Sequence, residues 1–169
     1  PIYIKKGEEV IIGNSKDDDI YPITFPNLWK DLKVGQKIMV DKGAVCLEVT
    51  KITKEGKLHT KVVFGEKIAP GKGMNFPGAK LSNKAITSID KEQIKHCADN
   101  GWEYISASFI RNKEDIATVR KAIGESNILL IAKIEDQQGV DNIDDIIENC
   151  DGIMIARGDL GSELPLEKL

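Results

Sequence analysis

Residues 128–136 read Ile-Leu-Leu-Ile-Ala-Lys-Ile-Glu-Asp, and residues 151–161 read Asp-Gly-Ile-Met-Ile-Ala-Arg-Gly-Asp-Leu-Gly. Each stretch contains a short apolar run with the length and flanks of a buried strand. Each run then gives way to charged and small residues. This pattern is typical of parallel strands in α/β proteins, whose functional groups gather where the strands end.

Helical patterns separate these two strands from each other and from an earlier one. The first predicted helix starts at Thr87 and Asp90, whose spacing fits a capping box, and it ends at Asn100. The second starts at Asn112 and ends at Gly124. Apolar residues recur at helical spacing in all three predicted helices: Ile94, Cys97, Ala98, Ile116, Val119, Ile123, Ile143, Ile146, Ile147 and Cys150.

The three strands, predicted over 102–109, 128–132 and 152–156, recur at intervals of roughly 25 residues. This rhythm suits a (β/α)₈ barrel, which averages about 30 residues per unit. A doubly wound parallel sheet has the same rhythm, so periodicity leaves both architectures open. Since three parallel strands do not close a barrel, we expect much of that domain to lie outside this chain.

Residues 1–70 have a different character, with short runs rich in β-branched residues between glycine-containing turns. Val45, Leu47 and Val49 share one face of an alternating segment, which predicts a hairpin in a small antiparallel barrel or sandwich. A Gly/Pro-rich junction follows over 71–78. The predicted strands are 9–12, 37–40, 44–53 and 57–64.

Composition disfavours several classes of function. The 169 residues carry a net charge of −3, which argues against general affinity for nucleic acid or for anionic membrane. The longest apolar run, 128–132, is too short to span a bilayer, and the sequence shows no secretory leader, so we expect a cytoplasmic location. The three cysteines form no CxxC pair and fit reduced thiols.

The strand ends carry the candidate chemistry. Lys133 and Glu135 are two residues apart, so they point to the same side of a strand. Adjacent strands lie about 4.8 Å apart, so Glu135 and Asp159 could bind one Mg²⁺ ion, beside which Lys133 supplies the charge that phosphoryl transfer needs. Gly158, without a Cβ, would let its backbone N–H approach an anionic substrate. The alternative is that these side chains are solvated or form a modest surface ion pair.

These stretches closely resemble the signature motifs of the pyruvate kinase family. The resembling segments occur in the family's order and with its approximate spacing, and together they cover nearly the whole chain. The resemblance implies an α/β fold: an incomplete (β/α)₈ TIM-barrel segment at 76–169, preceded by a small all-β barrel lid domain at 1–75. The segments are 40–43 (Val-Asp-Lys-Gly), 71–78 (Gly-Lys-Gly-Met-Asn-Phe-Pro-Gly), 106–111 (Ser-Ala-Ser-Phe-Ile-Arg), 132–140 (Ala-Lys-Ile-Glu-Asp-Gln-Gln-Gly-Val) and 151–161.

The resemblance also implies an activity, the glycolytic transfer of a phosphoryl group from phosphoenolpyruvate to ADP, giving pyruvate and ATP. It implies Mg²⁺ or Mn²⁺, a K⁺ ion whose ligands lie outside this chain, and a homotetrameric enzyme. By motif position, Lys133 corresponds to the lysine that stabilises the transferring phosphoryl group, Glu135 and Asp159 to the metal ligands, and Lys72 to a nucleotide-phosphate contact. The implied substrate site comprises Lys133, Ala156, Arg157, Gly158 and Asp159.

Several positions depart from the family. Lys42 replaces the second aspartate of the lid turn and reverses a charge that faces the active site when the lid closes, whereas the departures at Asn83-Lys84 and Ser162 are expected to be structural. Two other functions stay open: a Mg²⁺-dependent enolate aldolase or lyase on a related barrel, and a non-catalytic binding module at 1–75. Aldolases and lyases of that kind lack the inserted β domain, and residues 1–75 show no aromatic or basic binding face. We expect the chain alone, as a truncated portion, to be inactive.

Overall fold

The computed structural model describes residues 1–14 and 20–168 and divides the chain into two compact units. The first comprises Pro1–Asn83 with Gly161–Pro165, and the second comprises Lys84–Leu160 with Leu166–Leu169. Within the described residues, none of the helices has both the length and the apolar character needed to cross a membrane.

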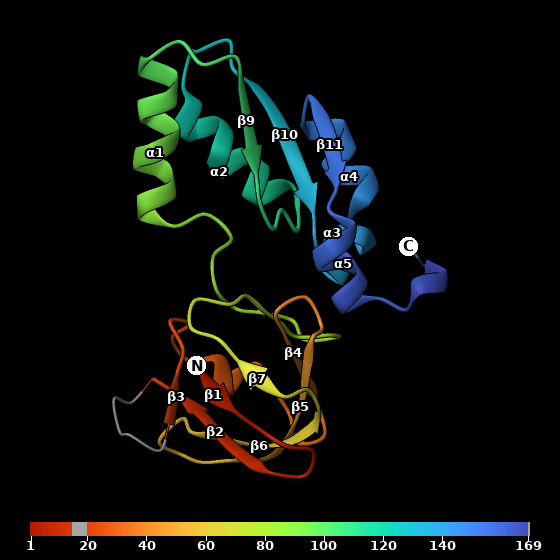
Figure 1. The fold of residues 1–169 in the computed structure, drawn as a ribbon. Helices are drawn as coiled ribbons and strands as arrows, with labels where there is room; N and C mark the ends of the chain where they lie inside the picture. The colour runs from red at the N-terminus through yellow and green to blue at the C-terminus, as the bar shows by residue number, and fades with distance from the viewer. Residues whose placement is uncertain (15–19, 169) are drawn as a thin grey trace. The chain divides into compact units, whose positions relative to one another are not determined.

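The first unit is built almost entirely of strands (Figure 1). These are β1 (Ile2–Tyr3), β2 (Glu9–Gly13), β3 (Ile20–Pro22), β4 (Lys37–Val40), β5 (Val45–Ile52), β6 (Leu58–Phe64), β7 (Lys67–Ile68) and β8 (Met74–Asn75), with a 3₁₀ turn at Leu28–Lys30. Six of them form one sheet in the order β3-β2-β6-β5-β4-β8, and β1 pairs with β7 in a second sheet. The pairing is antiparallel except between β2 and β3, a parallel pair that the sequence did not indicate.

The hairpin predicted from the alternating segments is confirmed. Strands β5 and β6 pair antiparallel, with Val49 opposite Thr60. Val45, Leu47 and Val49 are at most 2% exposed and lie in the hydrophobic core of the unit. Cys46 is buried as well, next to a shift in the ladder register, so both faces of the strand are covered at this point.

The Gly/Pro-rich junction contributes to the same sheet. Strand β8 lies within it and pairs antiparallel with β4, with Val40 opposite Met74. The Asp41 N–H donates to the Gly73 carbonyl at 3.0 Å and extends this pairing. The junction is therefore part of the first unit, which continues to Asn83.

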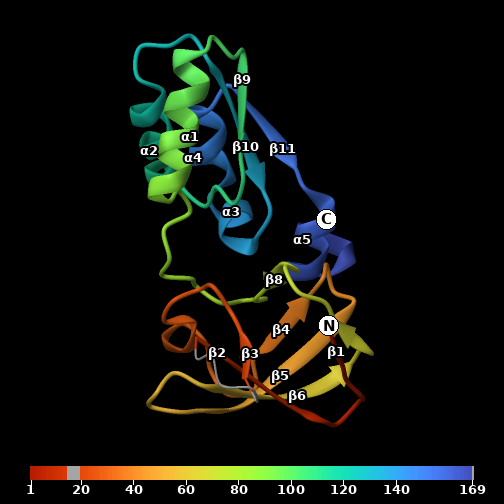
Figure 2. The same cartoon turned by 60° about the vertical axis from the view of Figure 1, so that its left-hand side comes forward.

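The second unit alternates helices and parallel strands. Its elements are α1 (Ser88–Asp99), β9 (Tyr104–Ala107), α2 (Lys113–Ile123), β10 (Leu129–Ile134), α3 (Gln137–Asp141), α4 (Ile143–Asn149), β11 (Gly152–Ile155), the start of α5 (Arg157–Glu163) and a 3₁₀ turn at Leu166–Lys168. The sheet has the order β11-β10-β9, and α1, α2 and α4 lie on one side of it (Figure 2). Leu130, Ala132 and Ile134 of β10 are buried in the core with these helices, whereas Leu129 is 41% exposed.

The predicted helix starts are confirmed. Thr87 and Asp90 form a capping box at α1, and the Asn112 side chain accepts the Asp115 N–H at the start of α2. The third predicted helix is wrong in two respects. Ile147 is 50% exposed, and Cys150 lies after the end of α4. A separate short helix, α3, also precedes α4.

Asp151 directly precedes β11 and connects it to α2 and β10. Its Oδ2 accepts the Arg120 guanidinium at 2.9 Å and the Leu130 N–H at 2.6 Å. These two donors, Arg120 first, hold the pKa of Asp151 below its usual range. A depressed pKa means that the stabilisation is complete above the unfolded value of about 3.9 and is lost as pH falls through the folded value.

We expect Asp151→Ala to lower the free energy of unfolding by about 1 kcal/mol above pH 4, because the site is partly exposed, and to matter less in stronger acid. Hydrogen exchange at Leu130 in a full-length protein carrying this chain measures the effect. Asp145→Ala is the matched control, since Asp145 pairs with Lys113 at 3.5 Å and both side chains are more than half exposed. If hydrogen exchange at Leu130 were accelerated equally in both variants, this account would be contradicted.

Candidate functional site

The carboxyl end of β10 brings two of the predicted site residues together. The strand runs two residues beyond its predicted end, so Lys133 lies within it and Glu135 follows directly. Lys133 Nζ lies 2.6 Å from Glu135 Oε1 and donates to Ser108 Oγ at 3.0 Å. Ser108 follows β9, the parallel neighbour of β10. The ammonium is therefore fixed at the point where two strands end.

Glu135 is an enclosed carboxylate, with its side chain 2% exposed. Its second oxygen, Oε2, accepts the Phe109 N–H at 2.9 Å. Phe109 has φ +53°, a left-handed conformation that is costly for a bulky residue and that recurs at functional sites. Burying a carboxylate is costly unless it is paired and hydrogen-bonded, and Glu135 has both an ammonium and an amide as partners. Glu135 is therefore not solvated, although it does form an ion pair with Lys133, which the alternative interpretation also allowed.

The neighbouring strand, β11, ends beside this pair. Ile155 lies opposite Ile134, and the Ala156 N–H donates to the Ile134 carbonyl at 3.1 Å. The chain then enters α5 without a loop, so Arg157, Gly158 and Asp159 occupy the first turn of a helix rather than an extended strand end. The half-buried Asp159 thus follows the same edge of the sheet as Glu135. The sequence did not indicate this short helix, whose Leu160 is buried.

These two carboxylates suit a hard divalent cation. Within residues 1–14 and 20–168, no group of three or more His, Cys, Asp or Glu is placed to hold a metal ion. Mg²⁺ commonly takes one or two carboxylates and fills its other positions with water and substrate oxygens. Glu135 Oε1 pairs with the Lys133 ammonium and Oε2 accepts the Phe109 N–H, and each carboxylate oxygen has a second lone pair that could bind a metal. Carboxylate oxygens are the kind of donor that Mg²⁺ and Mn²⁺ prefer.

Lys72 belongs to the first unit, whereas Lys133, Glu135 and Asp159 belong to the second. Its Nζ lies 3.1 Å from Asp41 Oδ2, and the two side chains are 43% and 44% exposed. Lys72 also lines a pocket of about 300 Å³ whose other walls include Tyr21, Phe25 and Phe76. The sequence indicated Lys72 through its motif but gave no sign of the contact with Asp41.

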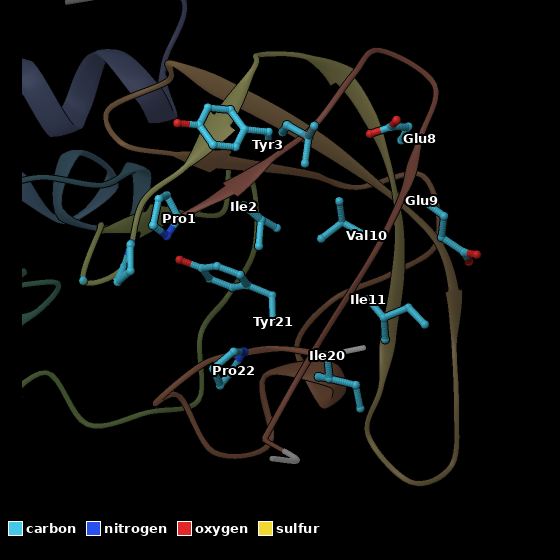
Figure 3. Close-up of a pocket in the computed structure, with 13 residues that line it drawn as sticks. Pro1, Ile2, Tyr3, Glu8, Glu9, Val10, Ile11, Ile20, Tyr21 and Pro22 are labelled. Carbon is cyan, nitrogen blue, oxygen red and sulfur yellow. The ribbon is translucent and has the colours of Figure 1, made fainter. Parts of the chain in front are cut away.

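A broader hollow of about 710 Å³ lies against β1, β2 and β3 of the first unit (Figure 3). Its lining includes Tyr3, Val10 and Tyr21, and none of the predicted site residues. The Tyr21 hydroxyl donates to the Ala69 carbonyl at 3.0 Å, and burial raises the pKa of Tyr21. This tyrosine is thus occupied as a structural hydrogen-bond donor.

Comparison with known proteins gives a consistent match over the whole chain. The family model described as "Pyruvate kinase, barrel domain" matches residues 2–169. The pyruvate kinase of Geobacillus stearothermophilus is 38% identical over 175 residues, which cover 99% of this chain and 30% of the relative. The pyruvate kinase of Debaryomyces hansenii is 43% identical, and pyruvate kinase 1 of Saccharomyces cerevisiae 38%, each over 88% of this chain and 30% of the relative. The chain spans about 30% of the length of these curated relatives.

Proposed function

Because this chain belongs to the pyruvate kinase family, we propose that it carries part of an active site that transfers a phosphoryl group from phosphoenolpyruvate to ADP. The observation that supports this most strongly is the enclosed Lys133–Glu135 pair at the carboxyl end of a parallel strand. The complete enzyme would be a cytoplasmic homotetramer that uses Mg²⁺ or Mn²⁺ together with K⁺. The K⁺ ligands would come from outside this chain.

We propose that residues 76–169 are a segment of a (β/α)₈ barrel and that residues 1–75 are its β-barrel lid domain. The match of residues 2–169 to a family model described as a barrel domain supports the barrel. The sequential strand order and the placement of α1, α2 and α4 over one face of the sheet are what a barrel segment requires. The open face carries Leu129, 41% exposed, and the Lys133 ammonium. In a closed barrel this face would become the interior.

Lys133 is suited to hold a phosphoryl group in flight. An ammonium has three N–H donors, and Glu135 and Ser108 use two of them among the described residues. The third is available for a phosphoryl oxygen, in a position fixed before the substrate arrives. A divalent cation held by Glu135 and Asp159 would neutralise the negative charge on the substrate oxygens. Gly158, without a Cβ, leaves room for the enolpyruvate portion beside Ala156 and Arg157.

The nucleotide would be contacted from the lid by Lys72, whose ammonium is half exposed. A Mg²⁺-dependent aldolase or lyase is the competing enzyme class, and the match to residues 2–169, the β unit included, favours the kinase. Activity assays on a full-length enzyme that contains this chain distinguish the two classes. We expect ATP formation that depends on phosphoenolpyruvate and ADP, and no aldol cleavage; cleavage without phosphoryl transfer would overturn the proposal.

The 169-residue chain purified alone should show no such transfer. Its parallel sheet has two unpaired edges, and apolar side chains such as Tyr104 and Ile155 are about half exposed. We expect hydrogen-exchange protection to concentrate in the first unit and the second to be labile or to self-associate. A coupled assay measures phosphoryl transfer, hydrogen exchange measures the protection of each unit, and sedimentation measures self-association. Measurable transfer, or uniform protection in a monomer, would contradict this expectation.

A further inference from the structure

We propose that Asp41 is a positioning residue for Lys72, and that its carboxylate holds the lysine ammonium in place for the phosphates of ADP. The inference rests on the nucleotide contact proposed above for Lys72. It concerns contacts within the first unit alone, and it assigns a function to a residue whose sequence motif gave none.

The backbone brings the two residues together. Asp41 directly follows β4, and Lys72 lies two residues before β8. Strands β4 and β8 pair antiparallel. The pairing of Val40 with Met74 continues into the hydrogen bond from the Asp41 N–H to the Gly73 carbonyl, at 3.0 Å. With both main chains fixed in this way, Asp41 Oδ2 meets Lys72 Nζ at 3.1 Å.

The turn that carries Asp41 is strained. Asp41, Lys42 and Gly43 have φ values of +54°, +55° and +83°, a left-handed run in which only Gly43 is free of steric cost. Aspartate tolerates this conformation better than most residues, whereas lysine gains nothing from it. Strained backbone of this kind clusters at ligand-binding sites, where the surrounding structure maintains it.

The exposure of the pair argues that its main contribution is not to stability. Both side chains are more than 40% exposed, and ion pairs in such surroundings contribute little to folding. A lysine that is already ordered loses less conformational freedom when a ligand binds, which improves affinity. Asp41 occupies one of three ammonium donors and leaves two for phosphate oxygens. Repulsion between the carboxylate and the phosphates is screened by water at this exposure, so ordering should dominate.

Asp41→Asn in a full-length enzyme is the direct test. Asparagine accepts the left-handed conformation and keeps the size of the side chain, so only the charge is lost. We expect the KM for ADP, and the ADP dissociation constant from calorimetry, to rise by about three- to tenfold. The kcat at saturating ADP and the KM for phosphoenolpyruvate should stay within about twofold of the wild type.

Three further variants separate positioning from a structural effect. Asp41→Gly removes both the carboxylate and the strain, so it should show the same ADP defect even though the turn is relaxed. Lys72→Met should weaken ADP binding, and the Asp41→Asn/Lys72→Met double variant should be no weaker than Lys72→Met alone. Glu9→Gln is the matched control. It removes another exposed carboxylate of this unit, one paired with His59 at 2.7 Å, and should leave ADP binding unchanged.

The outcomes separate this inference from the function on which it rests. If Lys72→Met leaves ADP affinity unchanged, the proposed nucleotide contact itself is wrong. If Lys72→Met weakens ADP binding while both Asp41 variants bind as the wild type does, Asp41 does not position it. Fully additive effects in the double variant would likewise overturn the proposal.

Discussion

Glu135→Gln should reduce the kcat of the full-length enzyme by at least about a hundredfold, because it removes a full charge from the proposed metal site. The structure adds a second reason. Glu135 accepts from two donors, the Lys133 ammonium and the Phe109 N–H. A glutamine has only one accepting oxygen, so its NH₂ group would face one of these donors at a position that is 2% exposed.

Asp159→Asn is the companion variant. It removes the other proposed metal ligand, and Asp159 is only half buried, so disruption of packing should be smaller. We expect a comparable fall in kcat and a weaker apparent affinity for Mg²⁺, measured by metal titration at saturating substrates. A variant of either residue that keeps more than about a tenth of the wild-type kcat at saturating Mg²⁺ would show that this residue is not an essential ligand.

Lys133→Met should depress kcat by about a hundredfold or more while changing the KM for phosphoenolpyruvate only severalfold. An interaction that strengthens as charge develops on the phosphoryl group lowers the barrier rather than tightening ground-state binding. The variant also leaves the enclosed Glu135 carboxylate without its ammonium, so the measurement needs Mg²⁺ present and a check of the unfolding midpoint.

Ser108→Ala is the control for this prediction, since it removes one hydrogen bond at 3.0 Å from the same ammonium and keeps its charge. We expect a loss in kcat of about tenfold, well below that of Lys133→Met, because a hydrogen bond to a charged group contributes at least about 1.5 kcal/mol. If Lys133→Met instead raises the KM strongly at a normal kcat, Lys133 is a simple anchor for the substrate anion.

The sequence predicts best those features that depend on residues close together in the chain. The Thr87–Asp90 cap and the β5–β6 hairpin each involve a few neighbouring positions and are confirmed. The parallel pairing of β2 with β3 depends on tertiary packing, and it leaves no short-range pattern. The exposure of Ile147 is of the same kind, because helical spacing does not determine where an apolar stripe ends.

The candidate site shows the same division. Strand alternation was enough to place Lys133 and Glu135 on one side of β10, and the structure has them in contact. The Phe109 N–H was beyond the reach of sequence reasoning, because a backbone donor has no side-chain signature. Its φ of +53° also runs against the preferences of phenylalanine, so propensity pointed away from the conformation that forms this contact.

The small β1–β7 sheet has a consequence for how this protein can be rebuilt. Tyr3 and Lys67 are partners across it, so the two ends of the intervening stretch, residues 4–66, stand side by side at a spacing of about 5 Å. The ends of a replacement segment therefore have to match a narrow gap, whatever the length of the segment, and domain insertion tolerates this geometry well. Strand β8 sets a limit, because it lies outside residues 4–66 but pairs with β4, which lies inside them. A chimaera that exchanges the lid should therefore carry β8 along with it, and one joined before Met74 would separate two strands that belong together.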